Sequence, residues 1–195
     1  MSESIKDGTG SGSLAEVASD NRLQTRAVTK TETQNATKRG YAFNINTGWI
    51  SSVAADSALI YLENQDDEDF FVDAIAVGLK NGSATDVQGI YAVKNPTGGT
   101  LVDAATDCDM IENRNFGSAR VFDTATKAYK ATASGQTLTG GSDFALFAQN
   151  DQGRLFATVD SVIPKGSSIG IRLEMLGSFS GDVYAALIGH QVEIL

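Results

Sequence analysis

The sequence predicts an all-β domain, a jelly-roll-like β-sandwich, and three observations support this fold class. The 195 residues include 20 glycines but only 2 prolines, with many Thr, Ser, Asn and Asp residues, as is typical of many turns between short elements. After residue 40, apolar residues recur with the period of two that half-buried strands show. Helical stripes are scarce: the segment 13–21 has room for two turns but lacks an apolar stripe long enough to dock.

The expected strands follow one another at short spacing. Tyr41, Phe43 and Ile45 alternate with smaller or polar residues before the turn NTG, and so predict the first strand. The segment 70–79 is apolar on both faces, which indicates a strand inside a packed sheet. About eight strands are predicted, over 41–46, 57–64, 70–79, 89–94, 143–150, 154–160, 167–176 and 181–195. This pattern predicts a two-sheet sandwich or jelly roll, with a meander barrel as the main alternative.

Two connections between these strands carry their own predictions. Only the residues DQG separate 143–150 from 154–160, which predicts a hairpin between these two strands. The stretch 97–141 is long and irregular, and we expect one or two short strands in it around 119–123.

Residues 1–40 differ from the rest of the chain. They are polar, with few large apolar residues, and carry a net charge of +1, whereas the other 155 residues carry −10. Such a segment buries too little area to offset the backbone entropy of roughly 1–2 kcal/mol per ordered residue. We therefore expect a flexible N-terminal arm over 1–40 and a β-sandwich domain over 41–195.

Composition also excludes several classes of protein. The net charge of −9 and pI of about 4.5 argue against nucleic acid or an anionic membrane as partner. The single cysteine cannot form an intrachain disulfide, and no apolar run reaches the length of a membrane span. We expect a protein made in a reducing cytoplasm.

No set of residues predicts catalysis, a cofactor or a metal site, so we expect a protein that is not an enzyme. The only histidine, His190, lies inside the last predicted strand and is expected to be a packing or interface residue. Cys108 lies between Asp107 and Asp109, whose charges should raise its thiol pKa. The sole tryptophan, Trp49, is expected to anchor the core or a subunit contact.

The acidic turn 65–69, with Asp66, Asp67, Glu68 and Asp69, has two interpretations. It could bind Ca²⁺ through several carboxylates, although it lacks the internal glycine and terminal glutamate of an EF-hand loop. We favour a solvated acidic turn between two strands.

The glycines Gly8, Gly10 and Gly12 suggest a phosphate loop, but no strand can precede them. The segment KDGTGSGSLAEVASDNRLQTRAVTKTETQNATKRGYAFNINTG resembles instead the N-terminal segments of small structural proteins of tailed bacteriophages. The shared features are the DGTGSG start, an NRL step and a NINTG strand before a β-sandwich. The resemblance covers about the first 48 residues and continues more weakly through 57–64.

The resemblance implies a virion protein, most simply a capsid decoration (cement) protein on the capsid surface, assembled in the host cytoplasm. Its implied partners are further copies of itself, as a homotrimer, and the major capsid protein of the phage. Spaced cations in the arm would contact neighbouring shell subunits by charge-assisted hydrogen bonds. These cations are Arg22, Arg26, Lys30, Lys38 and Arg39. The candidate trimer seam is formed by Tyr184, Leu187, His190 and Ile194, which could alternatively fill the intrachain core.

Two other functions stay open. A tail, fibre or head–tail component would bind host-cell glycans, through exposed aromatic residues in 97–141. A carbohydrate-active β-sandwich enzyme would use two of the carboxylates facing each other across a cleft.

Overall fold

The computed structural model describes residues 4–6, 14–17, 23–24, 31–82, 86–122, 126–150 and 152–192. It divides into two compact units, Met1–Thr31 and Glu32–Leu195. In the first unit, three short strands form an antiparallel sheet in the order β1-β2-β3. These strands are β1 (Ser4–Lys6), β2 (Leu14–Val17) and β3 (Leu23–Gln24). The expectation that no strand can precede Gly8 was wrong, because β1 ends at Lys6. Between residues 1 and 30 the structure describes only these three strands, and the candidate cations Arg22, Arg26 and Lys30 lie outside the described residues.

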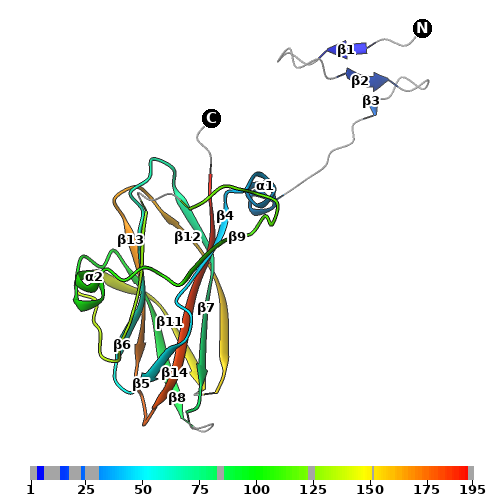
Figure 1. Cartoon of the computed structure of the whole chain (residues 1–195). Coiled ribbons are helices and arrows are strands. Elements are labelled where there is room, and N and C mark those ends of the chain that lie inside the picture. Colours follow the sequence, from blue (N-terminus) through cyan, green and yellow to red (C-terminus); the bar gives the residue numbers. More distant parts are fainter. Residues whose placement is uncertain are drawn as a thin grey trace. The chain divides into compact units, whose positions relative to one another are not determined.

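The second unit is a sandwich of two antiparallel sheets (Figure 1). Sheet I has the strand order β10-β6-β13-β8-β11 and sheet II the order β12-β7-β14-β4-β9, with β5 paired to β14. The sheet I strands are β6 (Ser57–Glu63), β8 (Val87–Lys94), β10 (Lys127–Lys130), β11 (Ser142–Asn150) and β13 (Ser168–Glu174). The sheet II strands are β4 (Ala42–Asn46), β5 (Ile50–Val53), β7 (Phe70–Lys80), β9 (Met110–Asn113), β12 (Arg154–Ile163) and β14 (Gly181–Gln191). The helices are α1 (Glu32–Arg39) and α2 (Thr100–Ala104).

The eight long strands pair as a nested set, first with last. Antiparallel pairs form between β4 and β14, β6 and β13, β7 and β12, and β8 and β11. The chain is thus one long antiparallel ribbon whose pairs fall alternately into sheet II and sheet I, which is the topology of a jelly roll. The predicted fold class is confirmed, and all eight predicted strands are present.

Two local predictions were wrong. The strands β11 and β12 do not form a hairpin, because β11 pairs with β8 in sheet I and β12 with β7 in sheet II. The connection DQG therefore crosses from one sheet to the other. The residues 119–122 are not a strand: Val121 is exposed, while Phe122 packs edge-on against Phe43 and Phe70 at ring distances of 5.2 and 5.9 Å.

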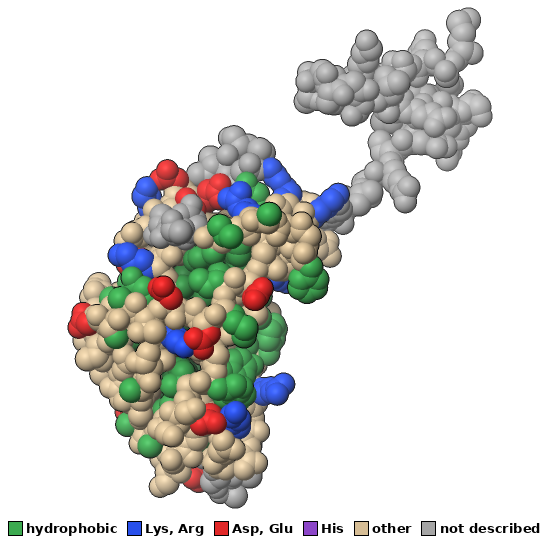
Figure 2. All heavy atoms as spheres, viewed as in Figure 1, with side chains coloured by type: hydrophobic (Ala, Val, Ile, Leu, Met, Phe, Trp, Pro, Cys, Tyr) green, Lys and Arg blue, Asp and Glu red, His purple; other side chains and the backbone are tan. Residues whose placement is uncertain are grey.

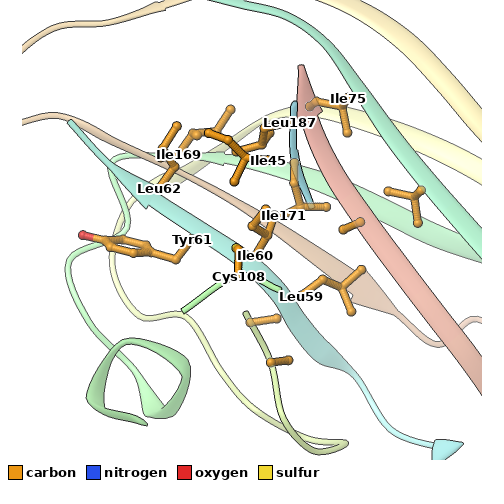
Figure 3. Close-up of a cluster of buried hydrophobic side chains, with 14 of the residues drawn as sticks. Ile45, Leu59, Ile60, Tyr61, Leu62, Ile75, Cys108, Ile169, Ile171 and Leu187 are labelled. Carbon is orange, nitrogen blue, oxygen red and sulfur yellow. The ribbon is translucent and has the colours of Figure 1, made fainter. Parts of the chain in front are cut away.

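The core lies between the two sheets and is made of alternating residues from each. Figure 3 shows Ile60, Leu62 and Ile171 of sheet I gathered with Ile45 and Leu187 of sheet II, while Tyr61 points the other way. All five aliphatic side chains are fully buried. At about 25 cal/mol per Å² of buried apolar surface, such side chains are the main source of stability of the sandwich. Figure 2 shows that other hydrophobic side chains reach the surface among the charged ones.

Helix α1 belongs to the sandwich unit, which therefore begins at Glu32 rather than at residue 41, where the sequence analysis placed the domain boundary. Glu32 in the first turn and Lys38 and Arg39 in the last turn complement the helix dipole. Gly40, at φ 81°, ends the helix in the left-handed conformation that glycine adopts easily. Ala36 is buried where the helix packs on β4 and β14.

Candidate interaction surfaces

The three described seam residues, which all belong to β14, do not share a face. Successive strand residues point to opposite sides, so Tyr184 faces outward from sheet II and Leu187 faces the core, where it is fully buried. His190 is outward again, beyond a register shift at Ile188/Gly189, but it too is buried. Ile194 lies outside the described residues. The seam prediction is corrected accordingly: of its described members only Tyr184 lies in a surface groove.

His190 lies in a small polar cluster with Asp73 of β7. Its Nδ1 atom is 3.0 Å from Oδ1 of Asp73, but neither ring nitrogen has a well-oriented hydrogen-bond partner in the described structure. We therefore take the pair as a close approach rather than a hydrogen bond. The ring stacks on Phe71 at 5.2 Å, and Asp73 also contacts Arg114 and Thr33, each at 3.4 Å. Thr33 belongs to α1, so this cluster fastens the helix to sheet II.

Cys108 is buried, and burial raises the pKa of its thiol to about 12. Asp109 and Asp107 also raise the pKa, whereas Lys130 lowers it. The predicted direction is confirmed, but the main cause is loss of hydration rather than the flanking charges. A thiol with this pKa is a poor nucleophile at neutral pH.

The acidic turn is occupied by partners from its own chain. Lys165 forms an ion pair with Asp67 and lowers the pKa of that carboxyl. Gln191 donates to Asp66 at 2.9 Å, and Arg120 lies 3.6 Å from Glu68. Within the described ranges, no three His, Cys, Asp or Glu side chains gather as a metal site would require.

Asn64 sets the shape of this turn. Its side chain is fully buried and donates to the carbonyl groups of Glu68 and Ile163, each at 2.8 Å. Its Oδ1 atom accepts from the backbone N–H of Asp66 at 3.1 Å and from Thr126 at 3.2 Å. No local pattern in the sequence marks Asn64, because its partners Ile163 and Thr126 are distant in the chain.

The described arm cations lie at the end of α1. Lys38 and Arg39 are exposed, and the guanidinium of Arg39 lies 5.7 Å from the Tyr41 ring centre. The backbone carbonyl of Lys38 accepts a hydrogen bond from Asn115 at 2.8 Å, which ties the helix end to the loop after β9.

The aromatic residues expected to bind glycans in 97–141 have separate environments. Phe116 is fully exposed, Phe122 is buried in the core, and Tyr129 stacks on Tyr61 at 6.1 Å. The described part of this region thus presents one exposed aromatic side chain rather than a platform of several.

The outer face of sheet II carries several exposed apolar side chains, among them Met110 and Phe156. The register sets Phe156, Ala76, Ala186, Asn46 and Met110 in one row across β12, β7, β14, β4 and β9. The two alanines form a low floor between the larger side chains at the ends of the row. The next row along the strands contains Ile188 and Asn44.

Gly78 explains how one end of this face is built. Gly78 pairs with Tyr184 across the sheet, and a Cβ atom on it would lie 2.2 Å from the Tyr184 ring. The ring therefore lies flat over the glycine and packs edge-on against Trp49, with ring centres 5.0 Å apart. The Lys80 ammonium lies 4.0 Å from the Trp49 ring centre. Trp49 is thus a half-exposed surface residue.

The side chains on this face border two adjoining depressions. One is bordered by Trp49, Tyr184, Met110 and Phe156, and the other by Phe116, Phe156 and the loop after β9. Both depressions share Asn44, Phe156 and Ile188, so they form one continuous groove. Figure 2 shows hydrophobic side chains at the surface on the side of β7, β12 and β14.

Comparison with known proteins gives no relative: no protein-family model matches the chain, and no curated protein matches it. In the portion of the chain that the structure describes, neither helix is long and apolar enough to cross a membrane.

Proposed function

We propose that the chain is a structural virion protein that decorates and stabilises a phage capsid. The jelly-roll unit would be the body on the capsid surface, and the N-terminal segment would contact neighbouring shell subunits. No covalent chemistry is required. Each added contact between capsomers is one more that internal pressure must break.

The observation that carries the proposal is the division of the chain into a compact sandwich and a separate N-terminal unit. The N-terminal unit carries the DGTGSG and NRL features that resemble virion proteins. Further support comes from the described side chains: the buried histidine, the thiol with a raised pKa and the internally paired acidic turn offer no assembled reactive site.

The proposal also accounts for the distribution of charge. Residues 1–40 carry a net charge of +1, while the rest of the chain carries −10. An acidic body discourages non-specific association, whereas the cations of the N-terminal segment can form charge-assisted hydrogen bonds to carboxylates on a shell.

The test is co-sedimentation of the full-length protein with capsids that lack it, from the phage that encodes the chain. We expect binding by the wild type and at least about a hundredfold weaker binding by Arg22→Ala/Arg26→Ala, because hydrogen bonds to charged groups contribute about 1.5–3 kcal/mol each. The control Lys127→Ala/Lys165→Ala removes the same charge from the sandwich and should bind as the wild type does. Failure of the wild type to bind would refute decoration, whereas equal binding by both double variants would refute the arm contact.

A further inference from the structure

The outer face of sheet II carries a contiguous apolar surface below helix α1. We call it the sheet II groove and define it by Trp49, Met110, Phe116, Phe156, Tyr184 and Ile188. These residues come from the strands β9, β12 and β14 and from two adjoining loops. Separate exposed apolar residues are normal on proteins, but a continuous set of aromatic, Met and Ile side chains marks a contact surface.

The exposed area is close to what a stable protein contact needs. Phe156 is 66% exposed and Phe116 is fully exposed, while Trp49 and Met110 are each nearly half exposed. With roughly 150–250 Å² for each aromatic side chain, the groove leaves on the order of 500 Å² of apolar surface in water. Monomeric proteins rarely expose more than a few hundred Å² in one patch, and a standard interface covers about 800 Å² on each partner.

The charges around the groove favour a second copy of this chain as its occupant. The bordering charged residues are of both signs: Arg154, Arg114 and Lys80 are basic, and Glu112 and Asp182 are acidic. A nucleic acid or an anionic membrane would need a basic border. Two copies can instead oppose acidic and basic residues around an uncharged centre, as contacts between identical surfaces require.

Asn44 lies at the centre of the groove, where it belongs to both depressions and stands next to Ile188 in the register. Its Oδ1 atom is shielded from water and accepts no hydrogen bond within the described residues. Because water cannot reach this atom, a donor on another chain cannot reach it either, and the choice of occupant rests on the exposed apolar area and on the charges around the groove.

We infer that the sheet II groove is the surface by which a second copy of this chain packs against the first. The contact buries the Phe156 and Met110 side chains and covers Trp49. This inference deepens the proposed function, because the self-associated protein would be the form that docks on a shell, but its test requires no shell.

The test measures the mass of the full-length protein by sedimentation equilibrium over a range of concentrations. We expect the wild type to self-associate at micromolar concentration and Phe156→Asp to raise the dissociation constant at least tenfold. The matched control is Leu146→Asp on β11, since Leu146 is 62% exposed but lies in sheet I. It should change the dissociation constant less than twofold.

Circular dichroism and thermal unfolding identify variants that fail to fold. A second variant, Met110→Glu, introduces a charge into the groove from a different strand. In the wild type, the sole tryptophan reports directly on the groove, so the Trp49 emission should shift to shorter wavelength as the protein self-associates.

A wild type that stays monomeric at 100 μM, roughly a hundredfold above the expected range, would overturn the inference. Self-association left intact by folded Phe156→Asp and Met110→Glu would also overturn it, as would equal loss in Leu146→Asp. A wild type that self-associates through the groove but does not bind shells would leave the inference standing and refute decoration.

Discussion

The outer faces of the two sheets differ in how far the chain itself covers them. Helix α2 and residues 131–139 cover part of sheet I, and Leu101 of α2 is fully buried there. Leu138 lies so close to β13 that a Cβ atom on Gly170 would be 2.3 Å from it. On sheet II, α1 covers only the end of β4 and β14, and the groove below it has no covering element among the described residues.

The uncovered part of sheet I carries a polar network around Tyr91, beside the exposed apolar side chains of Leu146 and Phe144 on β11. Arg172 of β13 lies over the Tyr91 ring, with its guanidinium carbon 4.0 Å from the ring centre. The same guanidinium contacts Asp143 at 2.7 Å and Glu174 at 3.6 Å. Water can face this network at little cost, whereas the apolar sheet II groove gains free energy when another surface covers it. The two sheets of one fold thus differ: sheet I is partly covered by its own chain, whereas the sheet II groove is exposed.

The largest expected effect comes from removing the cover of sheet I. Leu101→Ala should lower the free energy of unfolding by about 2–5 kcal/mol, because it leaves a cavity under α2. Phe156→Ala, on the open face, should change it by less than about 0.5 kcal/mol, because the side chain is largely exposed. Urea unfolding at a concentration that keeps the protein monomeric measures both. Equal losses in the two variants would mean that the faces do not differ as described.

The second prediction concerns Cys108, on the covered side. At pH 8 a thiol reagent should react with the native protein about a thousandfold more slowly than with the unfolded protein, because burial raises the thiol pKa from 9.0 to about 12. The neutral thiol stabilises the fold fully below pH 9, and this contribution is lost as pH rises from 9 toward 12, because the unfolded state ionises first.

Comparison with Cys108→Ala isolates this contribution from other groups that ionise at high pH, such as Tyr61, whose pKa burial raises to about 12. The stability of the wild type should fall more steeply above pH 9 than that of the variant. Rapid labelling of the native protein would show instead that residues 105–109 open readily to solvent.

A smaller loss of stability than that of Leu101→Ala is expected for the polar part of sheet I. Arg172→Met should cost about 1 kcal/mol, because the ion pair with Asp143 is partly exposed and the contact with Tyr91 is a surface cation–π interaction. Adding salt should reduce the difference. A double-mutant cycle with Asp143→Ala measures the pair, and a coupling energy near zero would show that the network does not stabilise this face.

Strand positions could be predicted because apolar alternation is a local property. The segments 57–64 and 70–79 became β6 and β7 with ends displaced by at most two residues. Helix α1 was missed because its eight residues are almost entirely polar and only Ala36 is buried. The Lys38-Arg39-Gly40 sequence is a typical helix end and was the one local indication of it.

The candidate site was less predictable. The described seam residues on β14 are three positions apart, and on a strand an odd separation places neighbouring choices on opposite faces. The register shift at Ile188/Gly189 adds a residue to β7, not to β14, so it leaves this alternation unchanged. The groove residues Met110 and Phe156 are more than 40 positions apart in the chain and come to border one groove only through the pairing of five strands.

The sequence by itself determined the fold class, the eight long strands and the acidic character of the body, because each depends on residues near one another in the chain. It also indicated the direction of the Cys108 pKa shift, but the main cause, burial, comes from the tertiary structure. Only the tertiary structure decided which strands pair, that β11 and β12 belong to different sheets, and that sheet I is covered while the sheet II groove is open. The physical reason is that a strand's pattern specifies which side is apolar but not which partner covers it. That choice is made when distant segments compete for the same apolar surface.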